Sequence, residues 1–156
     1  MLVGVISDTH GLLRPEAVEA LRGSDLIVHA GDVGAPEVLA GLRHLAPVTA
    51  VRGNVDTAPW TAVLPVADVV DAAGSLLYVL HQIEHLDVDP GVAGFAAVIY
   101  GHSHKPSAEV RKGVLFLNPG SAGPRRFSLP ICVARLRVSD QGLDPEFVDL
   151  EIAARR

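Results

Sequence analysis

The first half of the chain alternates apolar runs with segments of helical periodicity. The apolar runs Met1–Ile6, Leu26–Ala30 and Val48–Val51 have the length of buried strands. Helices are predicted between them, because Pro15 and Pro36 each stand where a helix can begin and apolar residues follow at helical spacing. Strands that alternate with helices across short loops predict a parallel sheet covered by helices.

The second half is richer in strands and contains one weak helical segment, Val88–Ala93. Gly74-Ser75 and Lys112-Gly113 are typical of hairpin turns. From Cys132 onward, apolar and polar residues alternate, which predicts a half-exposed edge or outer strand that could pair across a homo-oligomer. The strands predicted in this half are Val66–Ala72, Leu76–Leu80, Ala97–Tyr100, Ala108–Lys112, Val114–Leu117, Ile131–Val138 and Pro145–Ile152.

Composition narrows the class of protein. The length of 156 residues predicts one domain spanning residues 1–156. A net charge of −5 without a Lys/Arg block argues against a nucleic-acid polymer as partner, although it allows a small phosphorylated substrate. No apolar run reaches the roughly 18–20 residues of a spanning helix, so no membrane partner is expected. The N-terminus lacks the basic segment of a signal peptide, and a single cysteine forms no internal disulfide. We therefore expect a cytoplasmic protein.

Side chains that bind metals follow the ends of five predicted strands, where open α/β sheets place their sites. These side chains offer nitrogen and oxygen but no thiolate, a set that suits divalent first-row metals. They are too many for one ion that keeps a position open for substrate, and about right for two ions that share a bridging carboxylate. The candidate ligands are Asp8, His10, Asp32, Asn54, His81, His102 and His104.

The order of these residues resembles that of the calcineurin-like metallophosphoesterase superfamily, and the resemblance covers about residues 3–121. The compact length and the segment Asn118-Pro119-Gly120-Ser121 are similar to the small bacterial and archaeal phosphodiesterase branch of that superfamily. The shared motifs are Asp8-x-His10, Gly31-Asp32, Gly53-Asn54-x-Asp56, His81 and Gly101-His102-x-His104.

The resemblance implies an α/β fold, a four-layer αββα sandwich of two mixed β-sheets flanked by helices. It also implies two divalent ions, with manganese as the first choice and nickel, iron, cobalt or zinc as alternatives. A water between the ions would attack phosphorus as hydroxide. Asp32, Asn54 and His102 are the residues expected to be catalytic. The implied ligands are Asp8, His10, Asp32 and His104 for one ion, and Asp32, Asn54, His81 and His102 for the other, with Asp32 bridging.

Two positions depart from the superfamily pattern. Many members have a histidine after the motif asparagine, where this chain has Val55, which can neither stabilise a transition state nor protonate a leaving group. The small branch lacks this histidine too, so its absence does not indicate an inactive enzyme. Without this acid, we expect substrates with good leaving groups or protonation by water. Family members often have glycine after the histidine equivalent to His81. Here Gln82 makes His81 the least secure ligand, with His85 as the alternative.

Other polar residues are assigned structural roles. Asp56 is expected to orient its loop or a histidine that binds metal. His29, inside an apolar strand, is interpreted as a hydrogen-bonded core histidine, and Cys132 as a buried thiol. The segment 118–121 is expected to shape a turn beside the site. Arg125 and Arg126 could grip a phosphate, but a solvated loop pair is the preferred interpretation.

Three alternatives to a phosphodiesterase stay open. A phosphomonoesterase would use the same ligands. A non-catalytic scaffold would resemble the retromer subunit of the superfamily, which keeps the fold as a protein-binding platform, and Val55 is compatible with that. A nuclease for long DNA or RNA is disfavoured by the acidic balance of the chain.

Overall fold

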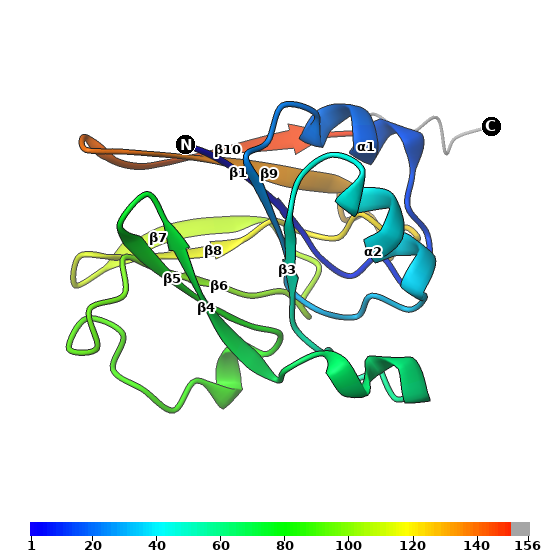
Figure 1. Cartoon of the computed structure of the whole chain (residues 1–156), viewed down its shortest axis with the longest axis horizontal. Helices are drawn as coiled ribbons and strands as arrows, with labels where there is room; N and C mark the ends of the chain where they lie inside the picture. Colours follow the sequence, from blue (N-terminus) through cyan, green and yellow to red (C-terminus); the bar gives the residue numbers. More distant parts are fainter. Residues whose placement is uncertain (151–156) are drawn as a thin grey trace.

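The computed structural model describes residues 1–150 and contains two five-stranded β-sheets (Figure 1). The first sheet has the order β10-β9-β1-β2-β3, in which β1, β2 and β3 are parallel and β9 and β10 are antiparallel to their neighbours. Its strands are β1 (Leu2–Ile6), β2 (Leu26–His29), β3 (Val48–Ala50), β9 (Cys132–Ser139) and β10 (Gly142–Asp149).

The second sheet has the order β4-β5-β6-β8-β7. Its three central strands are parallel, and the hairpin partners β4 and β7 form its edges. Ala73-Gly74, one residue earlier than predicted because Ser75 already pairs with Ala72, and Lys112-Gly113 close these hairpins with positive φ at both positions, as a two-residue type I′ turn requires. The strands are β4 (Ala67–Ala72), β5 (Ser75–Leu80), β6 (Ala97–Ile99), β7 (Ser107–Arg111) and β8 (Val114–Asn118).

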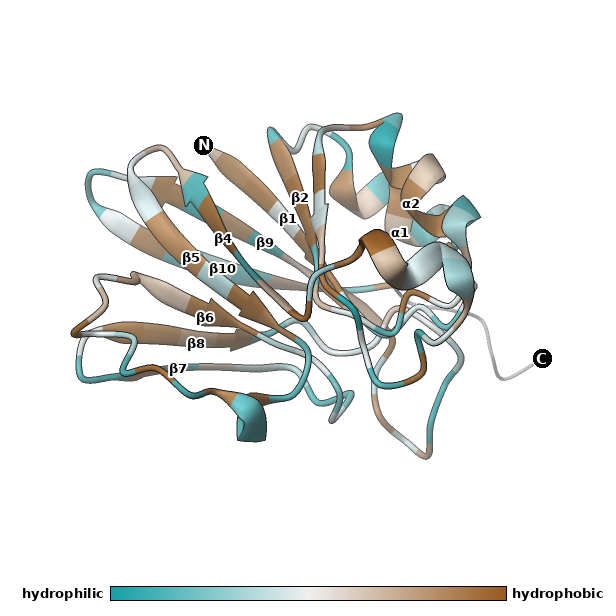
Figure 2. Ribbon diagram, turned by 60° about the horizontal axis from the view of Figure 1, so that its bottom comes forward, coloured by the Kyte–Doolittle hydropathy of each residue, from teal (hydrophilic) through white to brown (hydrophobic). Residues whose placement is uncertain are grey.

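The two sheets pack face to face around a continuous apolar core. Side chains of seven strands meet there, among them Val5, Leu77, Ile99, Leu117 and Leu136. Each is fully buried, which contributes about 1.5–3 kcal/mol per side chain. Figure 2 shows the strands of both sheets mostly in the brown of hydrophobic residues. The predicted sandwich of two mixed sheets is therefore confirmed.

Helices cover the outer face of the first sheet. They are α1 (Pro15–Leu21) and α2 (Pro36–Arg43), both beginning at the predicted prolines. Their buried residues, including Leu21 and Leu42, pack on the face of the sheet that points away from the second sheet (Figure 1). The outer face of the second sheet is covered more thinly, by the 3₁₀ turn η2 (Ile83–His85) and the chain after it. A further 3₁₀ turn, η1 (Pro59–Val63), follows β3.

Two predictions about local structure were wrong. The predicted helix at residues 88–93 is absent, and residues 90–94 form a turn, because the Asp89 carboxylate accepts hydrogen bonds from the backbone of Gly91 and Val92. Strand β9 is not an edge strand, since it lies between β1 and β10. Arg135, on the outer face of β9, lies beside α1, where its Nη1 donates to the carbonyl of Ala20 over 2.8 Å.

The other predicted strands are confirmed to within a few residues, except that residues 151 and 152 of the last one lie outside the described residues. None of the helices within residues 1–150 combines the length and the hydrophobicity required to cross a lipid bilayer.

Candidate metal centre

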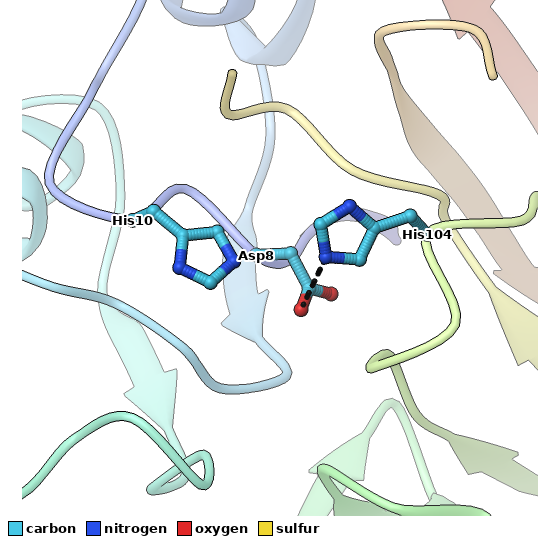
Figure 3. Close-up of side chains that lie close together, drawn as sticks. All are labelled: Asp8, His10 and His104. Atoms are coloured by element: carbon cyan, nitrogen blue, oxygen red, sulfur yellow. Dashed lines mark ion pairs between the residues drawn. The ribbon is translucent and has the colours of Figure 1, made fainter. Parts of the chain in front are cut away.

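The candidate ligands lie on five loops that leave the carboxyl ends of β1, β2, β3, β5 and β6. Asp8, His10 and His104 form one group (Figure 3), in which each residue offers a ligand atom within 4.8 Å of the others. Asp32, His81 and His102 form a second group by the same measure. The seventh candidate, Asn54, joins the second group, because its Oδ1 lies 3.2 Å from His102 Nδ1.

Two carboxylates connect the groups. Asp32 Oδ2 lies 3.2 Å from His81 Nε2 and 3.8 Å from His10 Nε2, so this oxygen faces both groups. Asp8 Oδ1 lies 3.4 Å from His104 Nε2 and 3.8 Å from His81 Nε2. The structure therefore brings the predicted ligands into one cluster, with Asp32 Oδ2 between the two groups.

Each carboxylate is fixed by one oxygen and presents the other to the cluster. Asp8 Oδ2 accepts hydrogen bonds from Ser7 Oγ over 2.7 Å and from the backbone N–H of His102 over 3.1 Å. Asp32 Oδ1 accepts from the backbone N–H of Val55 over 3.0 Å. Because these bonds come from the protein's own loops, the remaining oxygens point to the cluster in a fixed orientation.

The buried ring of His81 is oriented in the same way. Its Nδ1 donates to the carbonyl of Ala30 over 2.7 Å, which directs Nε2 at the two carboxylates. Burial alone would lower the pKa of His81, but the Asp32 carboxylate 3.2 Å from Nε2 and the negative charge of Asp8 outweigh it and raise the pKa. The cluster thus favours positive charge, and a metal ion would compete with a proton for the same nitrogen.

The same interactions lower the pKa of both carboxyl groups. Burial by itself would raise the pKa of Asp8 and of Asp32. For Asp8, the neighbouring His104 ring and the charge of His81 outweigh this effect. For Asp32, the neighbouring His81 ring and the hydrogen bond from the Val55 backbone do so. Both side chains are therefore anionic at neutral pH, as ligands of a cation must be.

Unsatisfied atoms show that the cluster fits a metal. Asp8 Oδ1, His10 Nε2 and His81 Nε2 are buried and have no hydrogen-bond partner. A buried polar atom without a partner costs about 1–3 kcal/mol, so such atoms are rare and need an explanation. Nitrogen and carboxylate donors of this kind suit divalent first-row metals, and a bound cation would satisfy all three atoms.

The backbone of the site is unusual as well. Among residues 1–150, eight residues other than glycine have a positive φ, and five of them are candidate ligands. This left-handed conformation costs a residue with a side chain roughly 1–3 kcal/mol, and such residues concentrate at functional sites. The five are Asp8, His10, Asp32, His102 and His104, with φ between 48° and 73°.

Neighbouring residues hold the ligand loops together. The backbone N–H of Asp8 donates to Gly31, and that of His10 donates to Asp32, over 2.9 and 3.0 Å. A β-carbon at Gly53 would overlap Asp32 Oδ1 and the backbone nitrogen of Asp32, so no larger residue fits there without displacing a ligand. The sequence analysis placed Gly53 in a motif but did not assign it this close contact.

The buried His29 connects two of these loops. Its Nε2 lies 3.0 Å from Thr9 Oγ1, which itself donates to the carbonyl of Val33 over 2.8 Å. The backbone N–H of Gly31 donates to His29 Nδ1 over 3.1 Å. His29 therefore donates through Nε2 and accepts through Nδ1, which only a neutral imidazole can do. Burial lowers its pKa to about 4.

Because buried His29 is neutral, we expect the stability of the folded protein to fall in mild acid. His29 is protonated near pH 6.5 in the unfolded chain but only near pH 4 in the folded one. The stability that neutral His29 gives the folded state is therefore complete above pH 6.5 and decreases as the pH falls from 6.5 to 4. Between pH 7 and pH 5, the unfolding free energy of the metal-free wild-type protein is expected to fall by about 2 kcal/mol more than that of the metal-free His29→Gln variant. Urea denaturation at both pH values measures this. The charged groups that act on His29 are Asp8, Asp32, Asp56 and His81.

Equal acid sensitivity of the two proteins would contradict the assignment. His44→Gln is the matched control, since His44 is exposed on the chain after α2 and should leave the pH dependence unchanged.

The structural roles assigned from the sequence are confirmed. The Asp56 carboxylate accepts hydrogen bonds from the backbone of Val33, Gly34 and Gly53, and so orients the loops that carry Asp32 and Asn54. His29 is a hydrogen-bonded core histidine. The alternative ligand His85 is exposed and belongs to neither group of candidate ligands.

The chain after β8 also behaves as predicted. Asn118 Nδ2 donates to the carbonyl of Gly101, and Ser121 Oγ donates to the carbonyl of Asp8, so this turn supports two ligand loops. Cys132 is buried, and burial raises the pKa of its thiol to about 12. Arg125 and Arg126 are exposed, as the preferred interpretation required.

Comparison with known proteins agrees with this geometry. The model of the calcineurin-like phosphoesterase superfamily domain matches residues 1–141. A probable metallophosphoesterase of Methanothermobacter thermautotrophicus is 34% identical over 163 residues, which cover 95% of this chain and 92% of that protein. The chain belongs to the calcineurin-like phosphoesterase superfamily, and within it resembles the small metallophosphoesterases.

Two solved structures show the range of proteins with this fold. A novel archaeal phosphodiesterase superposes with a TM-score of 0.79 at 22% identity, covering 95% of this chain and 100% of that one. Vps29 of Entamoeba histolytica complexed with zinc superposes with a TM-score of 0.70 at 24% identity, covering 97% and 100%. At these identities the likeness establishes the fold alone.

Proposed function

We propose that this protein hydrolyses small phosphodiesters at a site that holds two divalent metal ions, with manganese as the first choice of metal. The observation that carries the proposal is the position of Asp32 Oδ2, which faces His10 in one ligand group and His81 in the other. One shared carboxylate between two sets of nitrogen and oxygen ligands is the arrangement that a pair of ions requires. The ligands would be Asp8, His10, Asp32 and His104 for one ion, and Asp32, Asn54, His81 and His102 for the other.

When bound, divalent ions supply a nucleophilic water at neutral pH and positive charge beside the phosphate oxygens. Contact with the ester and the fixed orientation of the ligands come from the protein's own side chains. Asn54 is exposed and His102 is half-buried, whereas Asp8 and Asp32 lie deeper, so Asn54 and His102 are the ligands that can also contact an ester. The fixed carboxylates hold the donor set in place, which avoids reorganisation during the reaction.

The leaving group receives no proton from residue 55. Val55 lies with 46% of its surface exposed in the loop after Asn54, and its side chain has no ionisable group. An alcohol of high pKa would have to depart with its charge or take a proton from water. We therefore expect aryl esters, whose leaving groups are stable as anions, to react faster than alkyl esters.

The first experiment compares a diester with a monoester. Protein stripped with a chelator and reconstituted with manganese is expected to hydrolyse bis-p-nitrophenyl phosphate at least tenfold faster, in kcat/KM, than p-nitrophenyl phosphate. The measurement is release of p-nitrophenolate, and the stripped protein is expected to be inactive. The diester preference is supported by the fold shared with the archaeal phosphodiesterase.

Other outcomes would change the assignment. Faster hydrolysis of the monoester would make the protein a phosphomonoesterase with the same ligands. No turnover of either ester with manganese, nickel, cobalt or zinc would remove the catalytic proposal. It would favour a protein-binding role, for which the shared fold with Vps29 is the supporting observation.

A further inference from the structure

A pocket of about 310 Å³ adjoins one side of the ligand cluster. Two candidate ligands, Asn54 and His81, form part of its wall, while Asp8, His10 and His104 do not line it. The pocket therefore opens beside the second ligand group alone. A substrate whose phosphate lies against Asn54 and His102 would extend an ester group into this pocket.

The walls of the pocket differ in polarity. Its apolar lining residues include Leu80 and Tyr78 of β5 and Ala67 of β4, and its polar ones include Arg52 and Gln82. A volume of this size is at the lower end for small-molecule sites, which begin near roughly 300 Å³. It is suited to a short organic group with carbon on one side and a polar or charged end.

Arg52 is a cation without a counter-ion. Its backbone N–H donates to the carbonyl of Pro65 over 2.8 Å, which fixes the main chain directly before Gly53 and Asn54. Its side chain is half-buried, and within residues 1–150 its guanidinium has no ion pair or hydrogen bond. In contrast, Arg22, Arg111 and Arg135 each pair with a glutamate. A half-buried guanidinium beside a metal ligand is a binding group for an anion.

We propose that the physiological substrate is a small phosphodiester whose alcohol carries a second anionic group, a carboxylate or a phosphate, and that Arg52 binds this group in the pocket. The pocket also contains one acid, Asp87, but that side chain is exposed and water screens its charge. Because the net charge of the chain is −5, the field of the whole protein disfavours extra negative charge on a substrate. A preference for such a substrate therefore needs a local cation.

The test uses three diesters with the same leaving group. These are p-nitrophenyl methyl phosphate, p-nitrophenyl 2-carboxyethyl phosphate and p-nitrophenyl 2-phosphonoethyl phosphate, assayed with the manganese-loaded protein. We expect wild type to favour at least one anionic ester over the methyl ester by about tenfold or more in kcat/KM, mainly through KM, the size of a charge-assisted hydrogen bond. The two anionic arms distinguish a carboxylate from a phosphate.

The Arg52→Gln variant is expected to lower this ratio of kcat/KM to about one, and Arg52→Lys to retain part of it, since lysine keeps the charge but not the planar fork. Arg43→Gln, which removes an exposed charge from α2, is the matched control and should keep the wild-type ratio. A ratio near one in wild type, or the same ratio in wild type and Arg52→Gln, would overturn the proposal.

The inference rests on the proposed phosphodiesterase function, and the two fail differently. If wild type hydrolyses none of the three diesters, the proposed function fails. If it hydrolyses the methyl ester but does not discriminate between the esters, the function stands and the assignment of Arg52 falls. An equal loss on all three esters in Arg52→Gln would place the guanidinium on the reacting phosphate instead.

Discussion

Asp32→Asn protein is expected to lose metal-dependent hydrolysis of phosphate esters by about 1000-fold or more. Residues that only support a ligand typically cost 10–100-fold in affinity or activity, and Asp32 is the side chain that faces both ligand groups. Asparagine has the same shape, and its carbonyl can still accept the hydrogen bond from Val55. The substitution therefore removes the anionic charge between His10 and His81 with little other change.

Steady-state hydrolysis of bis-p-nitrophenyl phosphate measures the loss, and isothermal titration with manganese counts the ions. Wild type is expected to bind two ions per chain and the variant to bind at most one tightly. Asp140→Asn, in the exposed turn between β9 and β10, removes the same charge outside the site and serves as the control. If the variant kept activity within tenfold of wild type, the bridging role of Asp32 would be wrong.

Gly53→Ala is expected to have the second-largest effect. The new β-carbon would overlap both the carboxylate and the backbone nitrogen of Asp32, and backbone cannot move aside as a flexible side chain can. Overpacking of this kind costs about 1–3 kcal/mol of stability or more. Because the displaced atoms belong to a ligand, we also expect metal-dependent activity to fall by about 100-fold.

Gly91→Ala is the matched control for this substitution. A β-carbon at Gly91 would make only ordinary contacts, at 3.6 Å to Asp89 and 3.8 Å to Val114, and neither Gly53 nor Gly91 has a positive φ. Thermal unfolding and hydrolysis of the diester are measured for both variants. Wild-type activity in Gly53→Ala would show that the ligand loops can shift apart without cost.

The elements of the fold that follow from local patterns were predictable. Continuous apolar runs correspond to β1, β2 and β3, and proline at the first helical position marks both α1 and α2. The two failures have different causes. At residues 88–93 a local hydrogen-bonding side chain, Asp89, stabilises a turn, whereas the position of β9 depends on a partner strand that the pattern does not reveal. The alternation in β9 arises because Ala134, Leu136 and Val138 face the core between the sheets while Arg135 lies on the other face beside α1, and no pattern within β9 reveals that β10 lies beyond it.

The candidate ligands were predictable because each follows a strand end, and parallel strands place these ends at one edge. The orientation of the ligands was not. The hydrogen bonds of His102 with Asp8 and of Val55 with Asp32 join loops whose residues are 94 and 23 positions apart in the chain. The sequence also did not predict Arg52 as a site residue, because a single arginine before Gly53 does not indicate a pocket.

The left-handed backbone at five candidate ligands has a consequence for protein design. A centre of this kind cannot be transplanted by grafting side chains alone onto the strand ends of another sheet, because an ordinary extended or helical backbone would point them elsewhere. A host scaffold would have to reproduce the ligand loops and the backbone hydrogen bonds between them, which hold φ near 50–70°. The transferable unit is therefore the whole set of interlocked loops, and a minimal mimic should be built from their backbone first.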